Sequence, residues 1–400
     1  MSAAERPYVV VGAGMAGGRA AEMLALRGRG RGVVLVGGEA QRPYHRPPLS
    51  KELLGGGDPA EVYFRDATFY AARSVTLRLG VRAVGLDPSE RVVALDDGTE
   101  VPYAAAVLAP GTRPRRLAVP GADLAGIHLL RTLADAAAVR AALRPGSRVV
   151  VVGGGFIGTE VAAAAVAAGA VVTVVEAGPA PLATVLGAEV GALLQDLHER
   201  TGVRFRTGRT VERVHGVDRV TAVELAGGES LPADLVVVGI GGTPDVDWLD
   251  GSGVDVDDGI VVDEHCRTSV PDVLAAGDAA RWTHPGFGSL RIEHETHAQN
   301  QATAAARTLL GRPVAYRGLP HVWSDQGALA LRWAGHVPSW DDVVITRGDR
   351  PDRLTAAYLR CGRVGAVLTV NEPERQLEAA GLLQDGPFPA DLWQERRASA

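Results

Sequence analysis

Two short runs of β-branched residues along the chain are each followed by a glycine-rich turn and a stretch of small residues with helical character. The first run, residues 8–11, precedes Gly12-Ala-Gly14-Met-Ala-Gly17. The second run, residues 149–152, precedes Gly153-Gly-Gly155-Phe-Ile-Gly158. A continuous apolar run of this length is typical of a strand buried in a parallel sheet. The repeated pattern therefore predicts two strand–turn–helix units in one chain.

Both turns have the pattern GxGxxG, and this pattern between a strand and a helix is typical of dinucleotide binding. The first glycine allows the tight turn, the second allows the backbone to approach a pyrophosphate, and the third allows close helix–strand packing. The helix N-terminus adds N–H groups and partial positive charge for the phosphates. We predict two dinucleotide sites, with Gly12, Gly14 and Gly17 in the first and Gly153, Gly155, Phe156, Ile157 and Gly158 in the second.

Each dinucleotide site is expected to have an acid at the end of its second strand. In the second site, the apolar run 171–175 ends in Glu176, where a carboxylate can accept from a ribose 2′-OH. A 2′-phosphate at ~4 Å would be repelled by up to roughly 4 kcal/mol per charge pair. Residues 177–182 contain no arginine to offset this repulsion, so we predict a preference for NADH over NADPH. In the first site the acid is Glu39, which is either a ribose ligand or a solvated loop residue.

Three further apolar runs end in glycine-containing loops. Residues 107–114 and 235–244 each read as a strand followed by a tight loop, as expected for crossovers between two nucleotide-binding domains. The run at residues 273–277 leads directly to Asp278, where a carboxylate can bond a ribityl hydroxyl. Two dinucleotide folds in one chain suggest a flavin that takes electrons from a nicotinamide. The longest apolar stretch, 161–175, is interrupted by Gly169 and is too short to span a bilayer, so we expect no membrane segment.

Composition narrows the class of protein further. The chain has 400 residues, enough for two to three domains, with 46% hydrophobic and 22% charged residues. A net charge of −6 without a basic block argues against nucleic-acid binding. Cys266 and Cys361 are the only cysteines and have no metal-ligand spacing, so we expect no metal site and a reducing, cytoplasmic setting. The chain enters its first strand almost at once, so we expect no signal peptide.

One basic residue differs from all the others. Of the 41 basic residues, 40 are arginine and only Lys51 is lysine. Coding bias can replace lysine by arginine wherever a generic surface cation is sufficient. The compact ammonium of lysine is not equivalent to a planar guanidinium. Lys51 is therefore a candidate for a specific chemical role, or else a solvated loop cation.

Five segments together resemble the ferredoxin/rubredoxin reductases, a family of the two-dinucleotide-binding flavoproteins. They are residues 43–51 (PYHRPPLSK), 153–160, 276–278 (AGD), 291–294 (RIEH) and 323–326 (WSDQ). The resemblance covers about residues 7–371 and implies an α/β fold with two Rossmann-like domains, similar to glutathione reductase, plus a C-terminal α+β domain. It places FAD in the first dinucleotide site and NADH in the second. The implied domains are FAD-binding at 1–112 and 241–320, NAD-binding at 113–240 and C-terminal at 321–400.

The resemblance also implies roles for individual residues. Lys51 is similar to the lysine beside flavin N5, and Glu160 to its carboxylate partner. An ammonium at N5 stabilises the negative charge that arrives with hydride, and the carboxylate orients the ammonium. The residues expected to bind FAD are Gly12, Gly14, Gly17, Glu39, Arg46, Pro47, Lys51, Ala109, Gly111, Arg115, Asp278, Glu295, Thr296, His297 and Trp323. Those expected to bind NAD are Gly153, Gly155, Phe156, Ile157, Gly158, Glu160, Glu176, Gly239, Ile240 and Gly241.

A helix predicted at residues 296–310 is expected to point its N-terminus at the flavin C2 carbonyl, where its macrodipole stabilises negative charge. Trp323 either packs at the dimethylbenzene end of the flavin, lines the electron exit, or belongs to the core. Disulphide reductases of this superfamily carry a cysteine pair shortly after the first glycine turn, whereas residues 26–57 contain none. Thiol-relay chemistry is therefore excluded, and hydride transfer to FAD with onward single-electron transfer remains.

The sequence departs from the family pattern at four positions: Glu295 stands where close relatives commonly have tryptophan, Pro110 replaces a threonine, Val322 an aromatic residue and Asp245 an asparagine. A carboxylate at Glu295 would alter the redox potential and the electrostatics of docking. His294 and His297 flank it, and we interpret both as hydrogen-bonded scaffold. These departures leave the electron acceptor more open than the two cofactors.

The resulting hypothesis is an NADH-dependent FAD reductase that passes electrons to a small [2Fe–2S] ferredoxin, which then feeds an oxygenase. The alternatives are a flavin oxidoreductase with a small-molecule acceptor, or an NADH-sensing flavoprotein of the apoptosis-inducing-factor type. The chain is expected to be a monomer or a homodimer. An acidic ferredoxin would require a positive docking patch, for which the candidates are Arg113, Arg115 and Arg116, or Arg332, Arg347 and Arg363.

Overall fold

The computed structural model describes residues 6–28 and 30–398. Its first sheet is entirely parallel, with strand order β19-β7-β1-β2-β3. Short valine- and alanine-rich runs form these strands because both faces of the sheet are covered. The strands are β1 (Tyr8–Val11), β2 (Val33–Gly37), β3 (Val75–Leu79), β7 (Ala105–Leu108) and β19 (Val273–Ala275).

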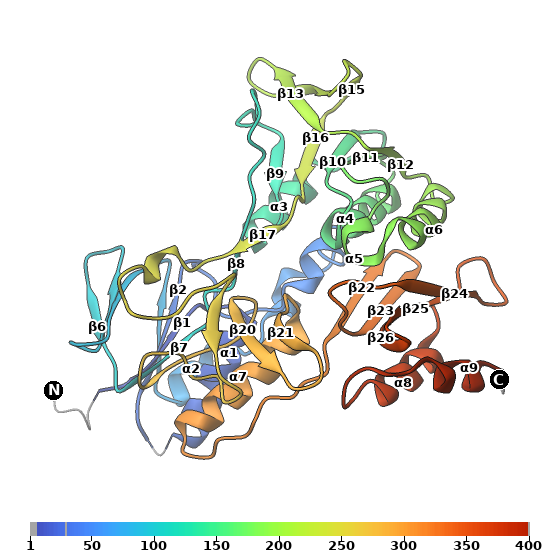
Figure 1. Cartoon of the computed structure of the whole chain (residues 1–400). Helices are drawn as coiled ribbons and strands as arrows, with labels where there is room; N and C mark the ends of the chain where they lie inside the picture. The colour runs from blue at the N-terminus through green and yellow to red at the C-terminus, as the bar shows by residue number, and fades with distance from the viewer. Residues whose placement is uncertain (1–5, 29, 399–400) are drawn as a thin grey trace.

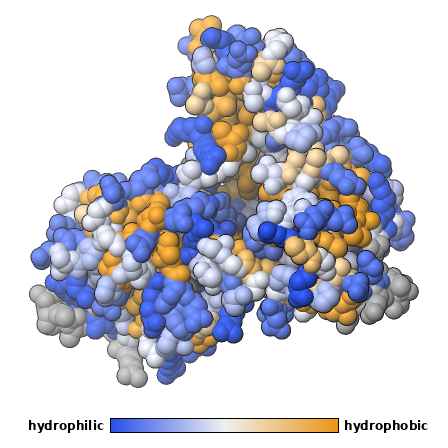
Figure 2. Space-filling model, in the orientation of Figure 1, coloured by the Kyte–Doolittle hydropathy of each residue, from blue (hydrophilic) through white to orange (hydrophobic). Residues whose placement is uncertain are grey.

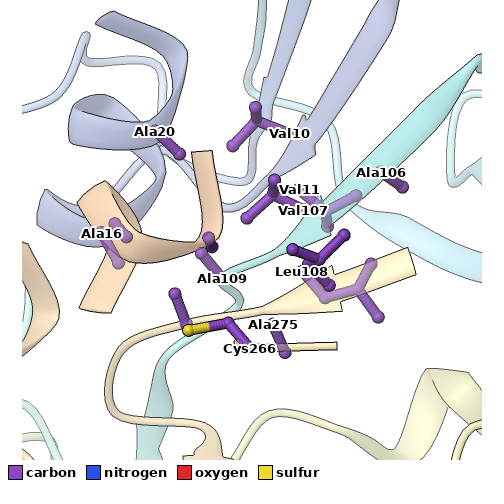
Figure 3. Packing of buried hydrophobic residues seen from close by; sticks show 14 of the residues in the cluster. Val10, Val11, Ala16, Ala20, Ala106, Val107, Leu108, Ala109, Cys266 and Ala275 are labelled. Atoms are coloured by element: carbon purple, nitrogen blue, oxygen red, sulfur yellow. The ribbon is translucent and has the colours of Figure 1, made fainter. Parts of the chain in front are cut away.

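Two helices pack together beside the first sheet, α1 (Met15–Arg27) and α7 (Glu295–Leu309) (Figure 1). The small residues of α1 allow close approach: Ala20 is fully buried in the same core as Val10 and Leu108. Figure 3 shows this core, in which the sulphur of Cys266 lies among aliphatic side chains. Burial raises the pKa of the Cys266 thiol to about 12, as expected for an inert core cysteine, whereas Cys361 is exposed.

The second sheet repeats this architecture with strand order β12-β11-β10-β16-β9, again entirely parallel. Helix α4 begins directly after the second glycine turn, as α1 does after the first. The strands are β9 (Ile127–Leu129), β10 (Arg148–Val152), β11 (Val171–Glu176), β12 (Arg204–Thr207) and β16 (Leu235–Val238), and the helices are α3 (Leu133–Ala142), α4 (Phe156–Ala167), α5 (Ala183–Leu186) and α6 (Ala188–Glu199).

Two antiparallel strands, β8 (Thr112–Pro114) and β17 (Gly242–Pro244), connect the two parallel sheets (Figure 1). They lie where the sequence predicted crossovers. Two small antiparallel sheets, one mixed sheet and several short helices complete these two units. The antiparallel sheets are β4 (Ala83–Asp87), β5 (Val92–Leu95) and β6 (Glu100–Pro102), and β13 (Val211–Gly216), β14 (Val220–Leu225) and β15 (Ser230–Pro232). In the mixed sheet, β20 (Ala280–His284) pairs antiparallel with β21 (Gly288–Arg291) and parallel with β18 (Ile260–Val262). The short helices are η1 (Pro47–Ser50), η2 (Pro59–Val62), α2 (Ala67–Ala72) and η3 (Asp247–Leu249).

The C-terminal part is a single antiparallel sheet with helices on one face. Its strand order is β22-β23-β26-β25-β24, with β27 paired to β26. Trp393 and Leu383 pack under one face, while Tyr358 and Leu368 on the other face share a core with Leu186 of the second unit. The elements are β22 (His321–Gln326), β23 (Leu329–Gly335), β24 (Asp342–Arg347), β25 (Leu354–Arg360), β26 (Arg363–Val370), α8 (Pro373–Leu382), β27 (Phe388–Pro389) and α9 (Ala390–Ala398).

The predicted fold class is confirmed: two Rossmann-like units and a C-terminal α+β unit are present. Figure 2 shows that the surface is hollowed where the three units meet. Helix α7 begins at Glu295, one residue before the predicted start. Among the described residues, no helix has the length and apolar character needed to cross a membrane.

Candidate active site

In the first glycine turn, two glycines have no room for a side chain and the third faces open space. Gly12 has a φ of +103°, and a Cβ there would lie 1.9 Å from the Ala109 carbonyl oxygen. A Cβ on Gly17 would lie 1.7 Å from the carbonyl oxygen of Gly12. By contrast, the nearest atom to a Cβ on Gly14 is a nitrogen of Arg46 at 4.0 Å. The turn thus leaves space for a phosphate where the helix begins, with a guanidinium facing it.

The second glycine turn has the same geometry. Gly153 has a φ of +103° and would clash with the Gly239 carbonyl oxygen at 2.3 Å if it carried a Cβ. A Cβ on Gly158 would likewise lie 2.0 Å from the carbonyl oxygen of Gly153. No atom lies within 4 Å of a Cβ on Gly155 or on Gly241, in the described structure. The open second glycine is the position at which a pyrophosphate approaches the backbone, so both turns fit a dinucleotide. Phe156 is half-buried and Ile157 is exposed beside this turn, and Ile240 follows Gly239 at the end of β16.

The two predicted acids are held in different ways. Glu176 accepts hydrogen bonds from the backbone N–H groups of Gly154 and Gly178, each at 2.6 Å, and so lies directly beside the second glycine turn. Glu39 accepts from the Tyr44 hydroxyl at 2.5 Å and from Arg46 at 2.7 Å. Of the two interpretations of Glu39, a freely solvated loop residue does not match these contacts.

Two arginines with adjacent side chains lie beside the first glycine turn. Arg46 donates to the carbonyl oxygen of Arg131 at 2.5 Å, and Arg131 donates to Asp278 at 3.4 Å. Burial, and then the nearby charge of Arg46, lower the pKa of Arg131. A Cβ on Gly111 would lie 3.2 Å from Arg131. Sequence reasoning missed Arg131, because the local pattern around it shows only the start of α3, where Thr132 and Asp135 form a capping box.

Lys51 and Glu160 form an ion pair of 2.7 Å although they are 109 positions apart in the chain. The Lys51 side chain is 14% exposed and that of Glu160 is 4% exposed. Lys51 follows η1, whose Pro47 carbonyl oxygen accepts from its ammonium at 3.3 Å. The ammonium also lies 5.2 Å from the ring centre of Trp323. The structure therefore brings Lys51, Glu160 and Trp323 together from three different units.

A buried hydrogen-bond chain leads from α6 to this ion pair. His198 donates to Gln326 at 2.7 Å, and Gln326 donates to the Ser324 hydroxyl at 3.1 Å. Ser324 donates to Glu160 at 2.6 Å, and Ser50 donates to the other carboxylate oxygen. All five side chains are buried. The serine and glutamine of the WSDQ segment thus hold the carboxylate that holds Lys51.

The hydrogen bond from Ser324 to Glu160 predicts a measurable effect for Ser324→Ala. Losing one hydrogen bond to a buried carboxylate costs about 1.5–3 kcal/mol, and Glu160 then gains freedom to turn away from Lys51. We expect the free energy of unfolding in urea to fall by about that amount. Stopped-flow reduction by saturating NADH should slow by roughly three- to tenfold, with little change in NADH affinity, since a 1.4 kcal/mol change is about tenfold.

Ser252→Ala is the matched control for this prediction. The Ser252 hydroxyl is also buried, but it donates to the Leu249 carbonyl oxygen at 2.6 Å, away from Glu160. This variant should lose stability and keep its reduction rate. Equal rates in Ser324→Ala and Ser252→Ala would contradict a positioning role for Ser324.

The N-terminal turn of α7 concentrates buried polar atoms that lack partners among the described residues: His294 Nδ1, Glu295 Oε2 and His297 Nε2. His294 accepts from the Trp323 backbone N–H at 3.1 Å, and His297 bonds the Tyr316 hydroxyl at 2.9 Å. Burial lowers the pKa of each histidine to about 4, so both are neutral at pH 7, as expected for scaffold. The turn fits the polar edge of a ligand. Thr296 is exposed on the same turn.

Several of the predicted binding and docking arginines have local partners of their own. Arg115 is exposed, and its backbone N–H donates to Gly241 at 2.9 Å. Arg113, one docking candidate, pairs with Asp245 at 3.0 Å and also with Asp247. Asp245 therefore has a local structural role. Arg332 pairs with Asp325 at 2.7 Å. The candidates without a described ion pair are Arg115, Arg116, Arg347 and Arg363, and Arg363 donates to the Pro387 carbonyl oxygen.

Comparison with known proteins agrees with this geometry. A family model described as pyridine nucleotide-disulphide oxidoreductase matches residues 6–302, and one described as reductase C-terminal matches residues 321–391.

The chain belongs to the pyridine nucleotide-disulphide oxidoreductases.

Among the relatives of this oxidoreductase is the anthranilate 1,2-dioxygenase system ferredoxin–NAD(+) reductase component of Burkholderia cepacia, 40% identical over 96% of this chain and 97% of that protein. Putidaredoxin reductase of Pseudomonas putida is 37% identical over 94% and 91%. Among solved structures, the covalent putidaredoxin reductase–putidaredoxin complex matches with a TM-score of 0.92 at 36% identity, covering 97% of this chain and 95% of that chain. The predicted family is therefore confirmed.

Proposed function

We propose that this oxidoreductase passes electrons from NADH through FAD to a small [2Fe–2S] ferredoxin that feeds an oxygenase. The observation that carries the proposal is the buried Lys51–Glu160 pair. Glu160 lies on the helix that begins at the second glycine turn, and Lys51 follows the loop of Arg46, whose guanidinium faces the first turn. The turns supply two dinucleotide sites, and the single lysine of the chain supplies a fixed positive charge.

The residues around the first turn fit FAD. Gly14 and Arg46 would hold the pyrophosphate, Glu39 the adenine ribose, and Asp278 the ribityl chain, with Arg131 adding positive charge. Bound FAD supplies a group that accepts a hydride and returns two electrons one at a time. The Lys51 ammonium stabilises the negative charge that arrives with the hydride. Glu160 fixes the direction of that ammonium and offsets the cost of burying it.

The residues around the second turn fit NADH. Gly155 and Gly241 leave room for the pyrophosphate, and Glu176 is positioned to accept from a ribose hydroxyl. Glu160, on the first turns of α4, lies between this site and Lys51. In this proposal the hydride donor and the flavin would bind on the two sides of one buried ion pair.

Two further parts of the proposal concern organisation. We assign residues 1–112 and 241–320 to the FAD domain, 113–240 to the NAD domain and 321–400 to the C-terminal domain; the paired crossover strands β8 and β17 support the first two boundaries. We place the protein in the cytoplasm, because the exposed thiol of Cys361 and the buried thiol of Cys266 suit a reducing compartment.

Electron delivery to a ferredoxin is testable with putidaredoxin, the partner in the related solved complex. In the presence of NADH and FAD, cytochrome c reduction should rise with added putidaredoxin or another [2Fe–2S] ferredoxin. The ferredoxin-dependent rate should fall several-fold between low and physiological salt, because opposite charges steer docking. Charge reversal at Arg115 or Arg347 tells the two candidate patches apart.

The other functions predict different results in the same assay. If none of several [2Fe–2S] proteins gave a ferredoxin-dependent rate, the proposal would be wrong. Faster reoxidation by a quinone or by oxygen would identify a small-molecule acceptor. Slow turnover with NADH-dependent dimerisation in light scattering would identify a sensor.

A further inference from the structure

A second acid–base pair connects the two segments that build the FAD site. His45 lies in the loop that leads to Lys51, and Glu295 is the first residue of α7. The His45 Nδ1–H donates to Glu295 Oε1 at 2.5 Å, and Gln299 donates to the same oxygen at 3.1 Å. The second carboxylate oxygen of Glu295 is buried and has no partner in the described part of the chain. The Glu295 side chain is thus held through Oε1, and its Oε2 has no partner among the described residues.

The location of this pair is set by its neighbours. His294, the residue before Glu295, bonds the backbone of Trp323, whose ring contacts the Lys51 ammonium. Helix α7 also packs on Gly277, which precedes Asp278: a Cβ on Gly277 would lie 3.6 Å from that of Ala298. The pair therefore lies at the helix end that faces the proposed flavin site.

Few other charges act on the pair. Phe64 contacts the edge of the His45 ring, and Arg65 lies over Phe64. Within the same loop, Tyr44 and Arg46 are bonded to Glu39. On α7, burial keeps His294 and His297 neutral at pH 7. In the described ranges, the ion pair between His45 and Glu295 is the only one that involves either side chain.

The pair changes its net charge with one proton. When His45 is protonated the pair is neutral, and when His45 is neutral the pair carries −1. The hydrogen bond from His45 to Glu295 raises the pKa of the imidazole, so the neutral pair persists to higher pH than for an isolated histidine. The His45 side chain is 38% exposed, which gives solvent protons access to it, whereas that of Glu295 is 14% exposed.

We propose that the His45–Glu295 pair binds a proton when FAD is reduced and releases it when FAD is reoxidised. This inference rests on the proposed FAD site. Reduction adds negative charge near an existing carboxylate, so it favours protonation of His45, and by linkage protonation of His45 favours reduction.

The step balances in protons and electrons. NADH gives a hydride, two electrons and one proton, to FAD and leaves as NAD⁺. His45 then takes one further proton from solvent at Nε2, while its Nδ1–H stays on Glu295. Two ferredoxin molecules each remove one electron, and both the hydride-derived proton and the His45 proton return to solvent.

Proton uptake during anaerobic reduction by NADH tests the proposal directly. A pH-indicator dye in weakly buffered solution reports protons bound, and flavin absorbance reports FAD reduced. Near the pKa of His45, the unsubstituted protein should take up more protons per FAD than His45→Gln, with a difference of up to about one proton. The difference should disappear far above and far below that pH. Glu295→Gln should lose the extra uptake as well and should have a higher flavin potential.

A matched pair elsewhere serves as the control. His215 bonds Glu224 at 2.6 Å on exposed strands of the NAD-binding unit. His215→Gln should take up the same number of protons as the unsubstituted protein. A second test uses the unsubstituted protein alone. The imidazole NMR signal of His45 should titrate at higher pH when FAD is reduced than when it is oxidised.

The outcomes separate this inference from the function on which it rests. Equal proton uptake by FAD-loaded unsubstituted protein and His45→Gln would overturn the inference, as would an unchanged His45 titration in the reduced protein. A chain that takes up no FAD at all would overturn the proposed function.

Discussion

Lys51→Met should accept hydride from NADH roughly 100-fold more slowly than the unsubstituted protein, since removing one charge-stabilising donor costs about 10²–10³ in rate. The ammonium is the only cation that Glu160 holds through an ion pair in the described structure. Its loss leaves the arriving negative charge unbalanced, and Glu160 then adds a second, unpaired negative charge. Stopped-flow measurement of flavin bleaching at saturating NADH gives the rate directly.

Lys51→Arg separates charge from shape. A guanidinium retains the positive charge but is planar and bulkier than an ammonium, and the site is enclosed by the Pro47 carbonyl, Glu160 and the Trp323 ring. We expect this variant to keep FAD and to be reduced at a rate between those of Lys51→Met and the unsubstituted protein.

The control for both variants is Arg312→Met, which removes one exposed positive charge beyond the end of α7. It should be reduced at the unsubstituted rate. If Lys51→Met were reduced as fast as Arg312→Met, the single lysine would be an accident of composition and the proposed role of the ion pair would be wrong.

Glu176→Ala should shift the nucleotide preference toward NADPH by at least about tenfold and at most about 1000-fold. A 2′-phosphate at ~4 Å from this carboxylate meets a repulsion of up to roughly 4 kcal/mol, and about 1.4 kcal/mol corresponds to tenfold. Two backbone N–H groups fix the carboxylate at the end of β11, so it cannot turn away from the phosphate. The measured quantity is the ratio of kcat/KM for NADPH to that for NADH.

Glu212→Ala, an exposed carboxylate on β13 of the same unit, is the control and should leave the ratio unchanged. NADH itself should bind somewhat more weakly to Glu176→Ala, because one hydrogen bond to the ribose is lost. An unchanged ratio in Glu176→Ala would show that the ribose lies elsewhere.

The sequence by itself predicted the strand, glycine turn and helix start of both nucleotide-binding units almost to the residue. The valine runs form β1 and β10, and the helices begin directly after Gly14 and Gly155. These features are local: strand periodicity, glycine conformations and a helix start depend on neighbouring residues, so the chain records them over short stretches. The segments at Lys51, Glu160 and WSDQ were also visible, because each is a compact motif.

Only the tertiary structure decided which of these residues meet. The partners of Glu160 are Ser50 and Lys51, 110 and 109 positions before it, and Ser324, 164 positions after it. Arg131 and His198 carry no sequence signal, since an arginine before a helix cap and a histidine in a helix are ordinary until folding brings Asp278 and Gln326 to them.

The same holds for His45 and Glu295. The sequence marked Glu295 as unusual but could not supply its partner, 250 positions away. Hydrogen bonds and ion pairs act over a few ångströms, so their partners are fixed by packing of whole domains rather than by spacing along the chain. The sequence therefore determined the cofactor turns and the lone lysine, and the packing of three units determined the charges that surround them.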